Sequence, residues 1–164
     1  MTVRYFVLLE EIRQELEVLA GVITRIETAL VDFTKAKNKE TGNYIVDSLA
    51  LRLQSFYTGI ESIFRSIAIN VDGELPAGEK WHVDLLEQMG IALPEIRPHV
   101  ITESTKQTLK EFLSFRHAIR NIYVFEIQSE PVIELASTTS KFFQTLKTEL
   151  ESFCVFLEQV GQKS

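Results

Sequence analysis

The fold is decided by the stretch "LEEIRQELEVLAGVITRIETALVDF" at residues 9–33, in which apolar residues return every three or four positions. An α-helix turns once every about 3.6 residues, so this spacing gathers the apolar side chains into one stripe along a single long helix. The polar segment "KAKNKETGN" at 35–43 then breaks the pattern. The residues of the stripe are Leu9, Ile12, Leu16, Leu19, Ile23, Ile26, Leu30 and Phe33.

Two further long stripes of the same spacing predict two further long helices. The second stripe runs from Val46 to Ile67, and the turn-rich segment "NVDGELPAGE" at 70–79 ends its helix. The last helix is predicted over about 130–161, with Pro131 in its first turn, where proline is well tolerated.

The region between these helices predicts two more helical segments and a crossover. A short helix is expected near 79–90, with Gly90 as its C-cap. The segment "IALPEIRPHVI" at 91–101 holds two prolines, so we expect an ordered but irregular crossover. A fourth long helix is predicted over about 103–124, with Thr102 as its N-cap.

The predicted fold class is all-α, an antiparallel four-helix bundle with one additional short helix. Long heptad-like helices joined by short turns are typical of such bundles. The alternative, an extended coiled-coil dimer, is disfavoured because three such stripes in one chain fold back more readily than they extend. The chain of 164 residues has the usual size of one domain and shows no internal repeat, so residues 1–164 are expected to form a single domain.

Composition limits the function classes. The net charge is −6 and the pI is near 5.2, so the chain as a whole does not resemble a protein that coats nucleic acid, and any such role needs a local patch. Cys154 is the only cysteine and is expected to be a small core residue. No Cys/His spacing suggests a metal, and we expect no cofactor.

The sequence shows no targeting or membrane segment. The N-terminus becomes charged too soon for a signal peptide, and no apolar run reaches about 18 residues. We therefore expect a cytoplasmic protein without a membrane partner.

The polar residues of the fourth long helix are the main functional signal. The stretch "FLSFRHAIRNIYVF" at 112–125 carries two arginines, a histidine and an asparagine, with no acid between Glu111 and Glu126. The helical stripe is predicted to contain Arg116 and Arg120, at positions that are apolar in the other helices. His117 and Asn121 are four residues apart and are expected to lie together on the adjoining flank. The predicted stripe is Leu109, Leu113, Arg116, Arg120 and Tyr123.

Two arrangements of Arg116 remain open, because a buried arginine without a partner is very costly. In the first, Arg116 pairs with a carboxylate on another helix of the same chain. In the second, it faces a cleft where an anionic ligand or a second subunit supplies the partner.

This stretch and its approach resemble the HEPN superfamily, and more closely its HepT-type toxin branch. That branch carries an arginine, usually followed by a polar residue, then a histidine five positions after the arginine and a tyrosine two positions later. Arg116, His117 and Tyr123 match the arginine, the polar neighbour and the tyrosine, whereas Asn121 stands at the histidine position. The helical layout matches throughout, and the motif-specific likeness covers residues 81–123.

A second register of the motif begins at Arg120. It would put Phe125 at the histidine position and Ile127 at the tyrosine position. The first register is preferred because it keeps the tyrosine, and both registers lose the histidine.

The resemblance implies a metal-independent ribonuclease that works as a dimer through the fourth long helix. Cleavage of RNA by its own 2′-hydroxyl needs a proton acceptor, a proton donor and a cation for the phosphate. Arg116 would contact the scissile phosphate and His117 would transfer protons. Asn121 cannot exchange a proton at neutral pH, so it would orient a phosphate or a ribose hydroxyl through hydrogen bonds.

The resemblance also implies a minimal nucleotidyltransferase partner that transfers nucleotide to Tyr123 and silences the toxin. A core tyrosine is the alternative role for Tyr123. Arg120 and His82 are expected as further ligand contacts, with helix packing as the alternative role for His82.

Three functions therefore stay open at the level of sequence. The first is a HEPN-type RNase toxin, intact or catalytically degenerate. The second is a non-enzymatic module that binds a nucleotide or a nucleotidyltransferase. The third is a purely structural bundle, in which Arg116 and Arg120 both form ion pairs within the chain.

Overall fold

The computed structural model describes residues 3–121 and 126–163 of the chain, and it confirms the all-α class. Four long helices and one short helix are present, and no strand is assigned among these residues. A five-residue π-helical turn extends the second helix. The elements are α1 (Val3–Lys35), α2 (Lys39–Ile67), η1 (Ala68–Asp72), α3 (Trp81–Met89), α4 (Glu103–Arg120) and α5 (Ser129–Lys163).

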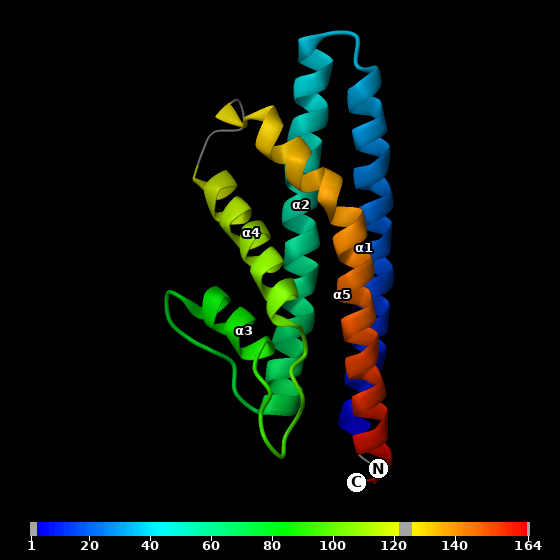
Figure 1. The fold of residues 1–164 in the computed structure, drawn as a ribbon, viewed down its shortest axis with the longest axis vertical. Helices are drawn as coiled ribbons and strands as arrows, with labels where there is room; N and C mark the ends of the chain where they lie inside the picture. Colours follow the sequence, from blue (N-terminus) through cyan, green and yellow to red (C-terminus); the bar gives the residue numbers. More distant parts are fainter. Residues whose placement is uncertain (1–2, 122–125, 164) are drawn as a thin grey trace.

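The four long helices run alternately up and down, as expected for an antiparallel bundle (Figure 1). α2 is the central helix, because it packs against α1, α3, α4 and α5. α1 and α5 lie side by side on one side of α2, whereas α3 and α4 lie on the other (Figure 1). None of the described helices has both the length and the apolarity needed to cross a membrane.

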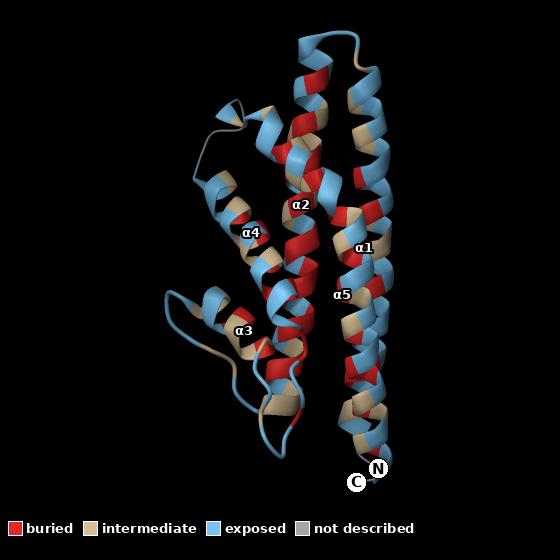
Figure 2. Cartoon of the chain, viewed as in Figure 1, coloured by how far each residue is buried: buried red, intermediate tan, exposed pale blue. Residues whose placement is uncertain are grey.

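The core follows the apolar stripes that the sequence predicts. Figure 2 shows buried residues along much of α2, whereas the outward faces of the helices are exposed. Phe56 of α2 joins two layers, since its ring lies 5.3 Å from that of Phe112 on α4 and 6.1 Å from that of Phe143 on α5. Cys154 is buried in α5, as expected for a core residue.

α1 and α2 approach each other closely at Gly59. A β-carbon at this position would lie 2.7 Å from Leu19 Cδ2 and 2.8 Å from Glu15 Oε1, both on α1. Such distances are well inside van der Waals contact, so alanine here would force the Leu19 and Glu15 side chains to shift.

The crossover between α3 and α4 is irregular but ordered, as the sequence predicts. Arg97 holds it in place from a buried position and donates two hydrogen bonds to the carboxylate of Asp72 in η1. The same guanidinium also donates to three backbone carbonyls, so all five of its N–H donors are used. Those carbonyls belong to Gln88, Ile91 and Pro98.

α4 differs in one respect from the predicted stripe. Its buried positions include Leu109, Phe112 and Arg116, whereas Leu113 is half-buried and Arg120 is exposed. The prediction that Arg120 lies on the packed stripe is therefore wrong. The reason is geometric, because α4 diverges from α2 toward its C-terminal end and leaves the last turn uncovered (Figure 1).

The ends of α3 and α5 lie within two residues of the predicted ones, whereas α2 begins at Lys39, inside the polar segment 35–43 that is predicted to separate the first two helices. Thr102 caps α4 by accepting a hydrogen bond from the backbone N–H of Thr105. Gly90 is the C-cap of α3, as predicted. The described part of α4 ends at Arg120 with Asn121 as its cap, and the last predicted residues of this helix lie outside the described residues.

Candidate functional site

Arg116 lies inside the protein, in an ion pair between α4 and α2. Its guanidinium donates two hydrogen bonds to the carboxylate of Glu61, at 3.3 Å from Nη1 to Oε1 and 2.9 Å from Nη2 to Oε2. The side chain of Arg116 is 4% exposed and that of Glu61 is 10% exposed. Of the two arrangements that the sequence left open, the first is therefore present in the structure.

An aromatic ring completes the environment of Arg116. The guanidinium carbon lies 4.7 Å from the centre of the Tyr57 ring, which comes one turn before Glu61 on α2. Cation–π contact of this kind partly compensates the cost of burying the charge. Burial raises the pKa of the Tyr57 phenol well above its ordinary value, and the negative charge of Glu61 raises it further.

His82 of α3 joins the same ion pair. Its Nδ1 lies 2.7 Å from Glu61 Oε2 and 2.9 Å from Arg116 Nη2. A carboxylate only accepts hydrogen bonds, so the contact with Glu61 is a hydrogen bond when His82 Nδ1 carries the proton. In that tautomer Nε2 is the basic nitrogen, and the His82 side chain is 28% exposed.

The other predicted residues at the end of α4 that the structure describes lie at the surface. His117, Arg120 and Asn121 are all exposed. The Asn121 side-chain amide donates a hydrogen bond of 2.7 Å to the backbone carbonyl of His117, and its nitrogen lies 3.5 Å from His117 Nε2. The prediction that His117 and Asn121 share one flank of the helix is confirmed.

The predicted site residues thus divide into two groups. Arg116 and His82 lie together around Glu61, between α2, α3 and α4, whereas His117, Arg120 and Asn121 lie on the outer face of the last turn of α4. Tyr123 lies outside the described residues, so its expected contact with a ligand or partner stays a prediction.

The third hypothesis required both arginines of α4 to form ion pairs within the chain. Arg116 meets this condition, but Arg120 makes no ion pair or hydrogen bond with the described residues. The last turn of α4 therefore presents, at the surface beside His117 and Asn121, a positive charge with no ion-pair partner among residues 3–121 and 126–163.

Sequence reasoning missed Glu61 and Tyr57, which form half of the buried cluster. One signal was present, because Glu61 is an acid four residues after Tyr57 and three before Phe64, on the widened apolar face of the second helix. An acid on an apolar face requires a buried cation, and α4 holds two, Lys106 and Arg116, of which Arg116 pairs with Glu61.

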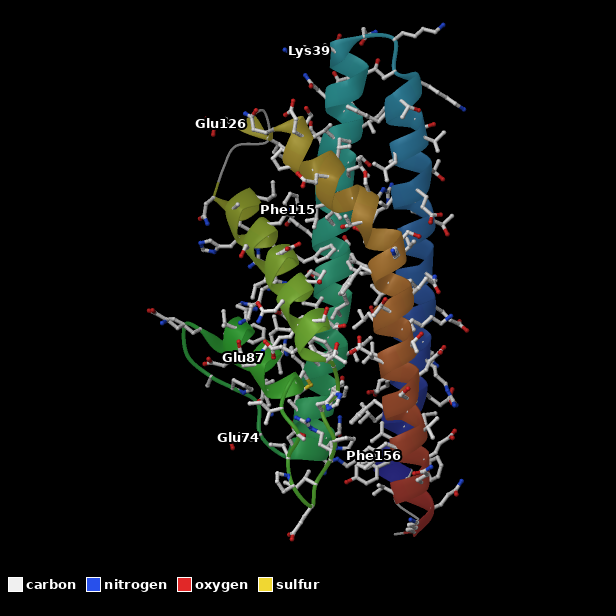
Figure 3. The ribbon with its side chains drawn as sticks, viewed as in Figure 1. Lys39, Glu74, Glu87, Phe115, Glu126 and Phe156 are labelled. Carbon is white, nitrogen blue, oxygen red and sulfur yellow. The ribbon has the colours of Figure 1, made fainter. Side chains whose placement is uncertain are left out.

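A second set of charges joins α3 to α4 near the buried cluster. Glu87 of α3, labelled in Figure 3, forms ion pairs with Lys106 and Lys110 of α4. Hydrogen bonds from these two lysines hold the pKa of Glu87 below its ordinary value. α3 is thus fixed against α4 by Glu87 and against α2 by His82.

The described residues contain no group of three or more histidine, cysteine or acidic side chains that could hold a metal ion. In both groups of predicted site residues, an imidazole can transfer protons and an arginine supplies positive charge. Asn121 adds hydrogen bonding in the exposed group.

Comparison with known proteins adds one finding. A protein-family model described as "HepT-like protein" matches residues 48–157, a span that runs from α2 to α5 and includes Glu61, His82 and Arg116. No curated protein and no solved structure matches the chain.

Proposed function

Because the chain belongs to the HepT-like protein family, we propose that it is the RNase toxin component of a toxin–antitoxin pair, or a catalytically degenerate relative of one. Family membership rests on a match to two thirds of the chain, and the helical bundle agrees with a HEPN-like domain. The observation that carries the finer proposal is the exposed cluster of His117, Arg120 and Asn121 at the end of α4.

In the proposed reaction the 2′-hydroxyl of RNA attacks the adjacent phosphorus and the bond to the 5′-oxygen breaks. A base takes the proton of the 2′-hydroxyl, and an acid returns a proton to the leaving oxygen. His117 is the proton-transfer group on α4, and Asn121 orients the phosphate or the ribose by hydrogen bonds. Arg120 supplies exposed positive charge for the phosphate.

Arg116 matches the arginine that the motif of the resembling family assigns to the phosphate, but it is buried. Its guanidinium is occupied by the Glu61 carboxylate, which has the same bidentate geometry as a phosphate. We propose that Arg116 contacts a phosphate only after its two hydrogen bonds to the Glu61 carboxylate have broken. While the ion pair is intact, Arg116 instead anchors α4 to α2.

The proposed assembly is a homodimer through α4 in the cytoplasm, with RNA as substrate and a minimal nucleotidyltransferase as antitoxin. A two-fold axis near the last turn of α4 would bring the exposed residues of both copies together. The nucleotidyltransferase would then modify Tyr123, which follows Asn121 by two residues in the sequence.

A second candidate function is a non-enzymatic module that binds a nucleotide or the nucleotidyltransferase. It is favoured by Asn121, because this side chain cannot exchange a proton where the family motif has a histidine. In that case the exposed residues at the end of α4 would bind the nucleotide or the nucleotidyltransferase without cleaving RNA.

Restoring the motif histidine tests these proposals by a gain of activity. Cleavage of single-stranded RNA by the purified protein is compared with cleavage by Asn121→His. Because Asn121 is exposed, folding should be unaffected, and the RNase proposal expects wild-type cleavage that rises at least about 10-fold in the variant.

The matched control is Gln128→His, at an exposed position just before α5. It adds a histidine away from the motif and should leave the rate unchanged. Absence of cleavage by both wild type and Asn121→His, together with a stable complex with a nucleotidyltransferase, would favour the binding module instead.

A further inference from the structure

The environment of His82 resembles that of a histidine held for proton transfer rather than for packing alone. One ring nitrogen, Nδ1, is fixed by Glu61 at 2.7 Å. The other, Nε2, makes no hydrogen bond with the described residues. A carboxylate that holds one imidazole nitrogen sets the tautomer and orientation of the ring, and it leaves the second nitrogen free to act as a base.

Two further contacts fix the ring of His82. The neighbouring Trp81 ring lies 3.6 Å from it, with an angle of 31° between the planes. Arg116 Nη2 lies 2.9 Å from Nδ1 and also holds Glu61, so the carboxylate cannot turn away without leaving a buried guanidinium unpaired. With its Nδ1 proton donated to Glu61, the imidazole is held by that carboxylate and by the Trp81 ring, whereas Arg116 acts on it only by fixing Glu61, because a guanidinium cannot donate to a protonated nitrogen. Part of the imidazole surface stays open to solvent.

Arg65 is a cation on the other side of the contact with Trp81, and no carboxylate among the described residues pairs with it. The guanidinium of Arg65, one turn after Glu61 on α2, lies 5.3 Å from the centre of the Trp81 ring. Arg65 is exposed and forms no ion pair with the described residues. The half-buried His82 and the exposed Arg65 therefore flank the same indole.

These two groups supply what the α4 surface lacks. Cleavage by the 2′-hydroxyl needs both a proton acceptor and a proton donor, but α4 offers only His117, since Asn121 cannot exchange a proton. The motif arginine is also committed to Glu61. A second histidine and a second cation lie together at the surface formed by Arg65, Trp81 and His82, here called the α2–α3 surface.

We propose that the α2–α3 surface is part of the RNA-cleaving site, with His82 as a proton-transfer residue, Arg65 as a phosphate contact and Glu61 as the positioning residue of His82. This proposal rests on the proposed RNase function. His82 Nε2 exchanges a proton with one of the two reacting oxygens, the 2′-oxygen or the leaving 5′-oxygen. His117 of the same or a second copy serves the other oxygen, so the protons balance over the reaction.

The first experiment measures single-turnover cleavage of a single-stranded RNA oligonucleotide by the full chain and by His82→Ala. The control is His99→Ala, which removes a histidine from an exposed loop. Cleavage should fall at least about 100-fold in His82→Ala and stay unchanged in His99→Ala, with both variants folded by circular dichroism. Full activity of folded His82→Ala would overturn the proposal and leave the RNase function intact.

The second experiment measures binding without chemistry, through the fluorescence of Trp81, which is the only tryptophan of the chain. A 2′-O-methyl RNA oligonucleotide cannot react, and its binding should change the Trp81 emission. Arg65→Ala should weaken this binding about 10-fold, because one phosphate contact is lost. An emission that does not respond to the oligonucleotide would overturn the RNA contact at the α2–α3 surface.

The two failures are distinguishable. A wild type that changes its Trp81 emission on binding RNA but does not cleave it would overturn the RNase function and the proton-transfer role together. A wild type that cleaves RNA with an unresponsive Trp81 would overturn only the α2–α3 surface.

The role of Glu61 is tested by the tautomer of His82, observed by long-range ¹H–¹⁵N NMR. In wild type the neutral ring should carry its proton on Nδ1. Glu61→Leu combined with Arg116→Met removes both buried charges while keeping apolar volume, so the fold should persist. In this double variant the Nδ1–H tautomer should lose its dominance and cleavage should fall. A dominant Nε2–H tautomer in wild type would overturn the positioning role.

Discussion

Arg116 of α4 and Glu61 of α2 form a bidentate ion pair inside the protein, with the shorter hydrogen bond measuring 2.9 Å. The pair joins α4 to α2, the central helix of the bundle. Removal of either partner therefore affects folding as well as any chemistry. Loss of toxicity in Arg116→Ala alone cannot be assigned to catalysis.

Arg116→Ala should destabilise the protein by about 3–5 kcal/mol, because the buried carboxylate of Glu61 loses its guanidinium partner and keeps only the hydrogen bond from His82. The measurement is the free energy of unfolding from urea denaturation, followed by circular dichroism. Arg120→Ala is the matched control on the same helix, since Arg120 is exposed and unpaired among the described residues, and its effect should stay within about 0.5 kcal/mol.

The double variant Glu61→Leu, Arg116→Met removes both buried charges but keeps apolar side chains in their place. Its free energy of unfolding therefore shows how much of the loss in Arg116→Ala comes from the unbalanced charge. Replacement of a buried ion pair by apolar residues is often neutral or stabilising, so the double variant should recover most of the loss. A double variant as unstable as Arg116→Ala would contradict the buried-pair interpretation.

Gly59→Ala should destabilise the protein by about 1–3 kcal/mol, because the added β-carbon meets Leu19 and Glu15 at less than 3 Å. Gly21→Ala provides the control on α1, where nothing lies within 4 Å of the new β-carbon. That change should instead stabilise α1 by about 0.5–1 kcal/mol. Thermal unfolding of both variants gives the comparison, and equal melting temperatures would refute the close approach of α1 and α2.

Arg97→Ala should loosen the crossover between α3 and α4. Its five hydrogen bonds hold η1, the end of α3 and the crossover together, and Asp72 would be left without its guanidinium partner. Amide hydrogen exchange, read by mass spectrometry, should accelerate in residues 88–101 more than in α1. Unchanged exchange in this segment would show that Arg97 does not hold it.

Alkaline pH should lower stability through Cys154. Burial raises the pKa of its thiol to about 11 in the folded protein. The unfolded thiol ionises near its ordinary value of about 8.5, so between these values the unfolded state binds fewer protons and stability falls as pH rises. The wild type should lose roughly 2 kcal/mol more than Cys154→Ala between pH 8 and pH 11. Parallel pH curves for the two proteins would contradict this interpretation.

Most of the fold could be predicted from the sequence, because the three- and four-residue spacing of apolar residues directly encodes which face of each helix is buried. The same reasoning erred at Arg120. Spacing alone says which residues share a face, but it does not say where a neighbouring helix stops covering that face. The divergence of α4 from α2 depends on the packing of the whole bundle (Figure 1).

The candidate site could be predicted only in part. The α4 residues were identified from their unusual polarity, and the contact between His117 and Asn121 follows from their spacing. The buried cluster could not be assembled in the same way, because Glu61 and Arg116 are 55 residues apart. Several carboxylates of the first two helices were equally available as partners, and only the packing of α4 against α2 selects Glu61.

The rate of RNA cleavage in the presence of a chelator tests the central claim most directly, namely that two histidines on different helices replace the missing motif histidine without a metal. The purified wild type should cleave single-stranded RNA with EDTA present. The double variant His82→Ala, His117→Ala, confirmed as folded by circular dichroism, should show only background hydrolysis. Undiminished cleavage by the double variant, or a wild type without activity, would contradict the claim.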